Sequence, residues 1–347
     1  MIEKEKLVEE IKEKIKKVPA ERRFILANSS VDGIISAFAF THLFGKSDIC
    51  FYKSVKPKFI DIPEEKDIVV IFDLIINQEE LNQFCEKNIT IINFDHHHVL
   101  HSQHKDYLCL NPKKILKKDG FSSSNTIYEL FKIDSELKEK IEKMRWLFAS
   151  AALSDSCYIE CLEILNEMVP FYPELTNTTL ADILNSKIFE ICQIIHHGRD
   201  NPEFILNLFE KIFNNNLSYR ELYNTEIFLD WVKKNHFLNQ ELFQNKVPIK
   251  ETKNFVFINS SGKNYAGNYA SFLNLHYKDN RIYVEYFSGK ILINSYFNKD
   301  IYEISKILNA IVLNESSAET YTQKRFDEII NYAIDHLERK EKQTKLF

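Results

Sequence analysis

Glycine is scarce in this chain, and long apolar runs, C-x-x-C pairs and an excess of basic charge are absent. Only seven of the 347 residues are glycine, which leaves little material for a glycine-rich phosphate loop. No apolar run reaches the roughly 18 residues that a membrane-spanning helix needs. Without a C-x-x-C pair, the six cysteines give no zinc-ribbon pattern, and Cys157 and Cys161 are predicted to be buried thiols.

The charge balance gives no sign of a general affinity for nucleic acid. The formal net charge is −5 at pH 7, and the hydrophobic and charged contents of 44% and 27% are ordinary for a globular protein. A local basic groove is compatible with this balance. Residues 1–17 are dense in Lys and Glu, with apolar residues at helical spacing, which predicts an amphipathic helix rather than a signal peptide. We therefore expect a cytoplasmic protein.

The first half of the chain alternates short apolar runs with helical patterns. Strands are expected at residues 23–27, 49–52, 67–73, 89–95 and 107–110. Helices are expected at residues 1–20, 32–44, 79–87 and 123–131, with one or two more between 137 and 161. Continuous apolar strands that alternate with helices predict an α/β fold with a parallel sheet covered on both faces. In such a sheet, ligands bind beyond the carboxyl ends of the strands.

The second half changes character after Pro170. Helices are expected at about 179–196, 202–213 and 217–235, strands at 254–259, 271–276, 281–287 and 290–295, and closing helices at 300–309 and 322–341. We predict three parts: a parallel-sheet domain at 1–165, a helical connector at 166–250, and a smaller α+β domain at 251–347.

Polar residues end several of the predicted strands and are expected to meet at one edge of the sheet. They are Asn28, Ser30 and Asp32, then Asp73, then Asp95, His96 and His97. Carboxylates and imidazoles at strand ends suit Mn²⁺ or Mg²⁺. Each residue also has a structural interpretation, because a histidine run can be a solvated loop and either Asp32 or Asp155 can cap a helix.

The order and spacing of these residues resemble the motifs of the DHH phosphoesterase family, which includes RecJ exonucleases, nanoRNases and type II inorganic pyrophosphatases. The opening motif H-x-D-x-D-G corresponds to residues 28–33, the lone strand-end Asp to Asp73, the D-H-H motif to residues 95–97, and the fourth motif to Asp155. The N-P and serine-rich stretch at 111–126 and the H-G-R stretch at 197–202 extend the resemblance over nearly the whole chain. It implies a DHH domain followed by a connector and a DHH-associated domain.

The resemblance implies two metal sites that share Asp73, and one of them is altered here. The second site of family enzymes corresponds to Asp32, Asp73, His96 and Asp155, all present. The first site corresponds to Asn28 and Ser30 together with Asp73, so an amide and a hydroxyl replace an imidazole and a carboxylate. We therefore expect at most one Mn²⁺ or Mg²⁺ per chain. His97 matches the histidine that contacts the substrate phosphate, and with Asp95 it is the residual catalytic pair.

A second departure falls in the small domain. The family's glycine-rich loop before the last helix corresponds to residues 314–320, where no glycine or histidine remains and two glutamates have entered. Ser316 and Ser317 stand at the centre of this degenerate phosphate loop. A side chain at each position hinders close approach of the backbone to an anion, and the added negative charge repels it.

Two functions of different classes follow from the resemblance. The first is a non-catalytic or weakly active subunit of a nucleic-acid-processing complex in replication, repair or RNA turnover, similar to degenerate archaeal RecJ paralogues. Its partner would be an active RecJ-like paralogue, or single-stranded DNA or RNA, and no membrane is involved. The alternative is an active single-strand-specific exonuclease or phosphodiesterase that uses one Mn²⁺, so whether the chain is an enzyme stays open.

Overall fold

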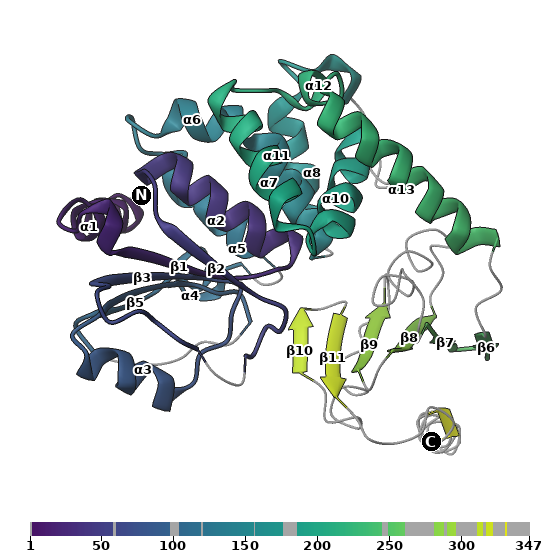
Figure 1. Cartoon of the computed structure of the whole chain (residues 1–347), viewed down its shortest axis with the longest axis horizontal. Helices are drawn as coiled ribbons and strands as arrows, with labels where there is room; N and C mark the ends of the chain where they lie inside the picture. Colours follow the sequence, from purple (N-terminus) through teal and green to yellow (C-terminus); the bar gives the residue numbers. More distant parts are fainter. Residues whose placement is uncertain are drawn as a thin grey trace. The chain divides into compact units, whose positions relative to one another are not determined.

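The computed structural model of the chain divides into two compact units, Met1–Asn235 and His236–Phe347 (Figure 1). It describes residues 2–57, 60–97, 104–118, 121–155, 157–175, 186–244, 249–260, 281–287, 290–295, 311–314, 317–321 and 330–331. Helix α13 (Glu226–Gln244) runs across the boundary between the units without a break. The finer division into a domain at 1–165, a connector at 166–250 and a domain at 251–347 stays a prediction.

The first unit is built on a five-stranded sheet in which every pair of neighbouring strands is parallel. Its strands are β1 (Arg23–Asn28), β2 (Asp48–Tyr52), β3 (Ile68–Phe72), β4 (Thr90–Phe94) and β5 (Tyr107–Cys109), in the order β2-β1-β3-β4-β5. All five residues of the central strand β3, Ile-Val-Val-Ile-Phe, are buried. A strand covered on both faces requires this continuous apolar run, and the α/β prediction is confirmed.

Helices cover both faces of this sheet. The described α-helices that begin in the first unit are α1 (Ile2–Lys16), α2 (Val31–Phe44), α3 (Gln78–Glu86), α4 (Pro112–Ile115), α5 (Ser123–Phe131), α6 (Lys138–Lys143), α7 (Arg145–Ser154), α8 (Tyr158–Met168), α10 (Lys187–Gly198), α11 (Pro202–Asn214), α12 (Tyr219–Leu222) and α13. Figure 1 shows α3 on one side of the sheet and α2 and α5 on the other. Successive strand residues enter opposite cores, so Val70 packs with the α2 side and Ile71 with the α3 side.

Two predicted helical stretches are more divided than expected. Residues 217–235 were expected to form one helix, but they contain α12 and the start of α13, separated at 223–225. The turn has local hydrogen bonds, from Asn224 N to Glu221 O and from Thr225 Oγ1 to Leu222 O, which end one helix before the next begins. Residues 137–161 contribute to three helices rather than one or two. None of the described helices is long and apolar enough to cross a membrane.

The second unit contains a mixed sheet among its described residues. Its strands are β6 (Ile249–Glu251), β7 (Phe255–Asn259), β8 (Ile282–Phe287), β9 (Lys290–Ser295), β10 (Ile311–Asn314) and β11 (Ser317–Tyr321), in the order β10-β11-β9-β8-β7-β6. Only β7 and β8 pair in parallel among them. Three of the predicted strands are found here, whereas the strand at 271–276, the helix at 300–309 and most of the helix at 322–341 lie outside the described residues.

The hairpin of β10 and β11 corrects one expectation. Residues 314–320 were expected to form a loop before the last helix, but Ser317 opens β11 and pairs with Asn314 of β10 and Asn294 of β9. All five residues of Ser-Ala-Glu-Thr-Tyr pair with β9, and this pairing places the stretch in the sheet as a strand. Ser316 itself lies outside the described residues.

Candidate metal centre

The first part of the site is the tight turn that joins β1 to α2. Ser30 caps the N-terminus of α2, and its Oγ accepts a hydrogen bond from the backbone N of Gly33 at 2.9 Å. A Cβ on Gly33 would lie 2.2 Å from the carbonyl oxygen of Asn28, so only glycine fits between the helix and the strand end. The turn places Asp32, which is completely buried, in the first turn of α2.

The ends of β3 and β4 supply the next groups. Asp73 follows β3 in the left-handed backbone region, with φ of 55°, and its N donates to Phe94 O at 3.0 Å. Asp95 follows β4, and its Oδ1 lies 2.7 Å from Nδ1 of His97. The side chain of Asn111 donates to the carbonyl oxygen of Asp95 at 2.7 Å, which fixes the backbone of the D-H-H segment. The contact of His97 Nδ1 with Asp95 fixes the orientation of the ring and leaves Nε2 as the second ring nitrogen.

Four side chains from four elements converge at this edge. The Nε2 of His96 lies 3.1 Å from Asp73 Oδ1 and 3.4 Å from Oδ2 of Asp155, the residue that ends α7. With Asp32, these residues each offer one ligand atom, and the four atoms lie within 4.8 Å of one another. Asp73, His96 and His97 form an overlapping group of the same kind. The structure thus brings together the four residues for which the sequence predicted a shared site.

The N-terminus of α5 holds one of these carboxylates. The two oxygens of Asp32 accept hydrogen bonds from the backbone N of Ser123 and of Ser124, both at 2.9 Å. A helix N-terminus carries unpaired N–H groups and partial positive charge, which favour an anion. Sequence reasoning noted the serine-rich stretch only as a family signature and missed this role, because the two segments are 91 residues apart in the chain.

The charges of the cluster are unbalanced. Burial, and then the charge of Asp73, raises the pKa of Asp32. Burial and the charges of Asp32 and Asp73 raise the pKa of Asp155 well above its usual value. Burial acts to lower the pKa of His96, but the hydrogen bond and charge of Asp73 outweigh it and raise that pKa to about 9. Three carboxylates around one imidazole have an excess of negative charge, which suits a divalent cation.

The two positions that depart from the family pattern make hydrogen bonds within the protein. The side-chain oxygen of Asn28 accepts from the backbone N of Ser30 at 3.1 Å. The hydroxyl of Ser30 donates to Oδ2 of Asp73 at 2.5 Å, on the carboxylate oxygen that does not face His96. Neither residue brings a charge to this side of Asp73.

The H-G-R stretch packs beside the sheet edge. Lys53, which follows β2, forms an ion pair with Asp200 at 2.6 Å. A Cβ on Gly198 would lie 2.2 Å from the ring of Phe204, so glycine allows close packing where α10 ends. Nδ1 of His197 lies 2.9 Å from Oδ1 of Asn235 in α13, and burial lowers the pKa of His197 to about 4. This histidine is therefore neutral near pH 7 and serves to join two helices.

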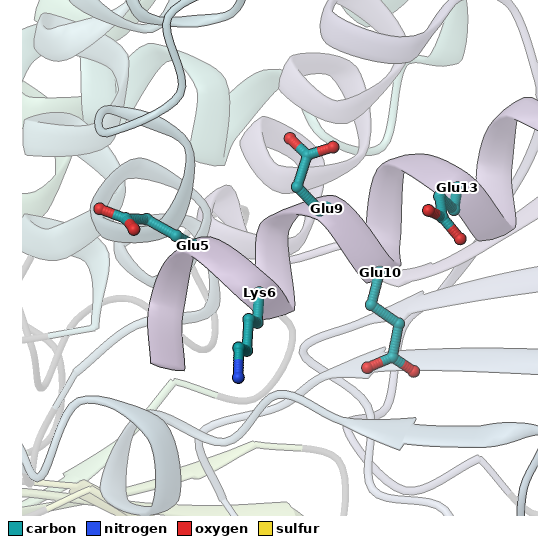
Figure 2. A pocket seen from close by; sticks show the side chains of 5 residues that line it. All are labelled: Glu5, Lys6, Glu9, Glu10 and Glu13. Atoms are coloured by element: carbon teal, nitrogen blue, oxygen red, sulfur yellow. The ribbon is translucent and has the colours of Figure 1, made fainter. Parts of the chain in front are cut away.

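A hollow along α1 has a different character. Figure 2 shows its lining side chains spread along a single helix: Glu5, Lys6, Glu9, Glu10 and Glu13. Four carboxylates and one ammonium group from one element do not converge on a point. Their charge repels phosphate groups, and such a face is an ordinary solvated helix surface.

Comparisons with known proteins agree with this geometry. Residues 24–154 match the model of the DHH family, N-terminal domain. A structure of exonuclease RecJ bound to manganese is similar at a TM-score of 0.55 and 14% identity, covering 94% of this chain and 92% of that one. The DHH domain of a member of a ribosomal-protein family is similar at 0.62 and 13%, covering 96% and 90%. No curated protein sequence matches.

RecJ from Thermus thermophilus, in complex with Mn²⁺, is similar at a TM-score of 0.57 and 15% identity, covering 96% of this chain and 55% of that chain. This chain therefore spans about half the length of that RecJ. At such identities the likeness shows the fold alone. The chain shares the α/β fold of these structures. Its residues 24–154 match the N-terminal domain of the DHH family.

Proposed function

We propose that this chain is a non-catalytic or weakly active RecJ-like subunit of a cytoplasmic nucleic-acid-processing complex, with at most one Mn²⁺ or Mg²⁺. One observation carries the proposal, which is the asymmetry around Asp73. On one side, ligand atoms of Asp32, Asp73, His96 and Asp155 lie within 4.8 Å of one another. On the other side, Asp73 meets the neutral hydroxyl of Ser30.

The donor set fits one divalent cation. Three carboxylates and one imidazole are oxygen and nitrogen ligands of the kind that Mn²⁺ and Mg²⁺ accept. A first-site cation would have only Asp73 and two uncharged groups, Asn28 and Ser30, which offset little of its charge. In two-metal phosphoryl transfer, paired cations stabilise the attacking and leaving oxygens and help generate hydroxide. Loss of one of the two cations raises the activation barrier by several kcal/mol, and each ~1.4 kcal/mol slows the reaction tenfold.

The site residues have a structural role that does not depend on catalysis, and this role is compatible with a chain that acts by binding a protein partner. Buried carboxylates are costly unless a cation, each other or hydrogen bonds stabilise them. Here Asp32 is tied to α5, Asp73 to Ser30 and His96, and Asp95 to His97, so the site also joins elements of the first unit. We propose an active RecJ-like paralogue as the partner, with single-stranded DNA or RNA as a second ligand of the complex.

Capture from native extract tests this proposal. The full chain, Asp73→Ala and Asp67→Ala are used as baits, followed by mass spectrometry and a nuclease assay on single-stranded DNA and RNA with Mn²⁺. Asp67 is a matched control because it lies at the amino end of the strand that Asp73 follows and pairs with Arg22. We expect all three baits to retain a RecJ-like protein, and we expect each chain purified without that partner to cleave slowly or not at all. No retained partner, together with wild-type cleavage that depends on Asp73, contradicts the proposal.

A single-metal phosphodiesterase is the second candidate function. It is favoured by the pair of Asp95 and His97, at 2.7 Å, which keeps an imidazole oriented beside the four ligands. In this case the isolated chain cleaves single-stranded substrates in Mn²⁺ measurably, more slowly than an intact two-metal enzyme, and the cleavage depends on Asp73. His97→Ala would then abolish cleavage while it leaves Mn²⁺ binding by the four ligands in place.

A further inference from the structure

The donor and acceptor roles of the Ser30 hydroxyl are both determined by its partners. The backbone N of Gly33 can only donate, so at 2.9 Å the oxygen of Ser30 accepts from it. The ionised carboxylate of Asp73 can only accept, so the single proton of the hydroxyl points to Asp73 Oδ2 at 2.5 Å. The backbone N of Ser30 in turn donates to Asn28. Ser30 is thus held on three sides and has one rotamer available for its contact with Asp73.

This contact divides the two oxygens of Asp73 between two tasks. Oδ2 accepts from Ser30, while Oδ1 lies 3.1 Å from Nε2 of His96, which is another member of the four-ligand group. A carboxylate with both oxygens assigned cannot turn about its terminal torsion without breaking one of these contacts. The side chain of Asp73 is only 4% exposed, so no solvent molecule can take over the role of either partner.

We propose that Ser30 is a positioning residue, which holds Asp73 so that Oδ1 faces the remaining cation site while Oδ2 is unavailable to a second cation. This inference rests on the proposed single-cation site. The hydroxyl proton supplies to Oδ2 the positive partner that a first-site cation would otherwise supply. The serine at position 30, where family enzymes have a carboxylate, thus adapts the site to one cation. Ser30 contributes to cation binding although it does not touch the ion.

The prediction is a loss of affinity without loss of a ligand. Replacement of groups that orient metal ligands commonly costs about 10- to 100-fold in metal affinity. We expect Ser30→Ala to weaken Mn²⁺ binding by about tenfold, because Asp73 becomes free to turn. Ser30→Thr keeps the hydroxyl and the helix cap, so it should restore affinity to within about threefold of wild type.

Isothermal titration calorimetry with MnCl₂ on the full chain tests this inference. Ser29→Ala is the matched control, since Ser29 is the neighbouring serine and its hydroxyl makes no hydrogen bond among the described residues. Because Ser30 also caps α2, Ser30→Gly is included: glycine is nearly as good a cap and, like alanine, has no hydroxyl. Thermal unfolding of each variant without metal reports the stability change separately from affinity.

The outcomes separate this inference from the proposed function. The inference is supported if wild type and Ser29→Ala each bind one Mn²⁺ with equal affinity. It also requires that Ser30→Ala and Ser30→Gly bind Mn²⁺ about tenfold more weakly, and that Ser30→Thr restores the affinity. Wild-type affinity in Ser30→Ala and Ser30→Gly overturns the inference alone and leaves the single-cation site intact. If wild type binds no Mn²⁺, the proposed cation site fails and the inference fails with it.

Discussion

The two carboxylate oxygens of Asp73 face groups of different charge. On the retained side, His96 lies 3.1 Å from Oδ1, and Asp32 and Asp155 complete the group of four candidate ligands. On the altered side, Ser30 meets Oδ2 with a hydroxyl. A decayed site would leave an unpaired carboxylate oxygen in the interior, at considerable cost. Here the side of Asp73 that faces Ser30 is closed by hydrogen bonds within the protein, whereas the other side belongs to a group of four candidate ligands.

The difference between the two sides is clearest when one residue is removed from each. We expect Asp155→Ala to weaken Mn²⁺ binding by about 100-fold or more, because a charged ligand is lost. Asn28→Ala should leave affinity within a few-fold, because its oxygen is used only by Ser30 N. Calorimetric titration of both variants measures this difference. Equal losses in the two variants would show that Asn28 still takes part in cation binding.

Repair of the altered side gives the next largest effect. Asn28→His combined with Ser30→Asp restores two charged or imidazole ligands beside Asp73. We expect the number of Mn²⁺ ions per chain to rise from one to two, and cleavage of single-stranded nucleic acid to increase at least about tenfold. Each single substitution is the control. Two bound ions without any gain in cleavage would place the remaining defect in the second unit, where Ser317 lies in a hairpin.

The unbalanced charge of the retained side predicts an unusual pH dependence without metal. The pKa of His96 is raised to about 9, above its usual value of 6.5, so its stabilisation is full below pH 6.5 and is lost as pH rises towards 9. The raised pKa values of Asp32 and Asp155 act in the same direction at lower pH, because the folded state binds more protons than the unfolded state.

Metal-free protein should therefore lose on the order of a few kcal/mol of stability between pH 6.5 and 9, since one pKa unit corresponds to about 1.4 kcal/mol. Mn²⁺ competes with these protons, so saturating Mn²⁺ should reduce or reverse the trend. Thermal unfolding at several pH values with and without Mn²⁺ tests this. His96→Ala should flatten the metal-free curve, and an unchanged curve in that variant assigns the dependence to other groups.

Much of this site was predictable because its residues follow apolar strands. The runs at 67–73 and 89–95 predicted two parallel strands, and the polar residues after them, Asp73 and His96, meet where a parallel sheet brings carboxyl ends together. The left-handed backbone of Asp73 was not predicted, because aspartate tolerates this conformation but does not by itself indicate it.

Contacts between distant segments were not predictable from local patterns. The bonds from α5 to Asp32 and from Ser30 to Asp73 depend on how helices pack on the sheet, which periodicity does not encode. The β10–β11 hairpin was missed for a related reason. Its polar strand Ser-Ala-Glu-Thr-Tyr has few apolar residues, and pairing with β9 rather than its own composition makes it a strand.

The smallest expected effect concerns the orientation of Asp32 on the retained side. Its carboxylate accepts from the backbone N of Ser123 and Ser124, and the side chain of Ser124 adds a further hydrogen bond that lowers the pKa of Asp32 against the dominant effect of burial. Ser124→Ala removes that last bond and the hydrogen bond of the Ser124 hydroxyl with Ser122 Oγ at 3.1 Å, and keeps both backbone N–H groups. A bond to the carboxylate is typically worth about 1 kcal/mol, or about fivefold in Mn²⁺ affinity. Asp32→Asn, by contrast, should weaken binding far more, because the charge itself is lost. Titration of both variants, with Ser124→Thr to restore the hydroxyl, measures the two contributions. If Ser124→Ala were as damaging as Asp32→Asn, the two backbone N–H groups of α5 would not be enough to hold the carboxylate, and the serine side chain would be the main support of the retained side.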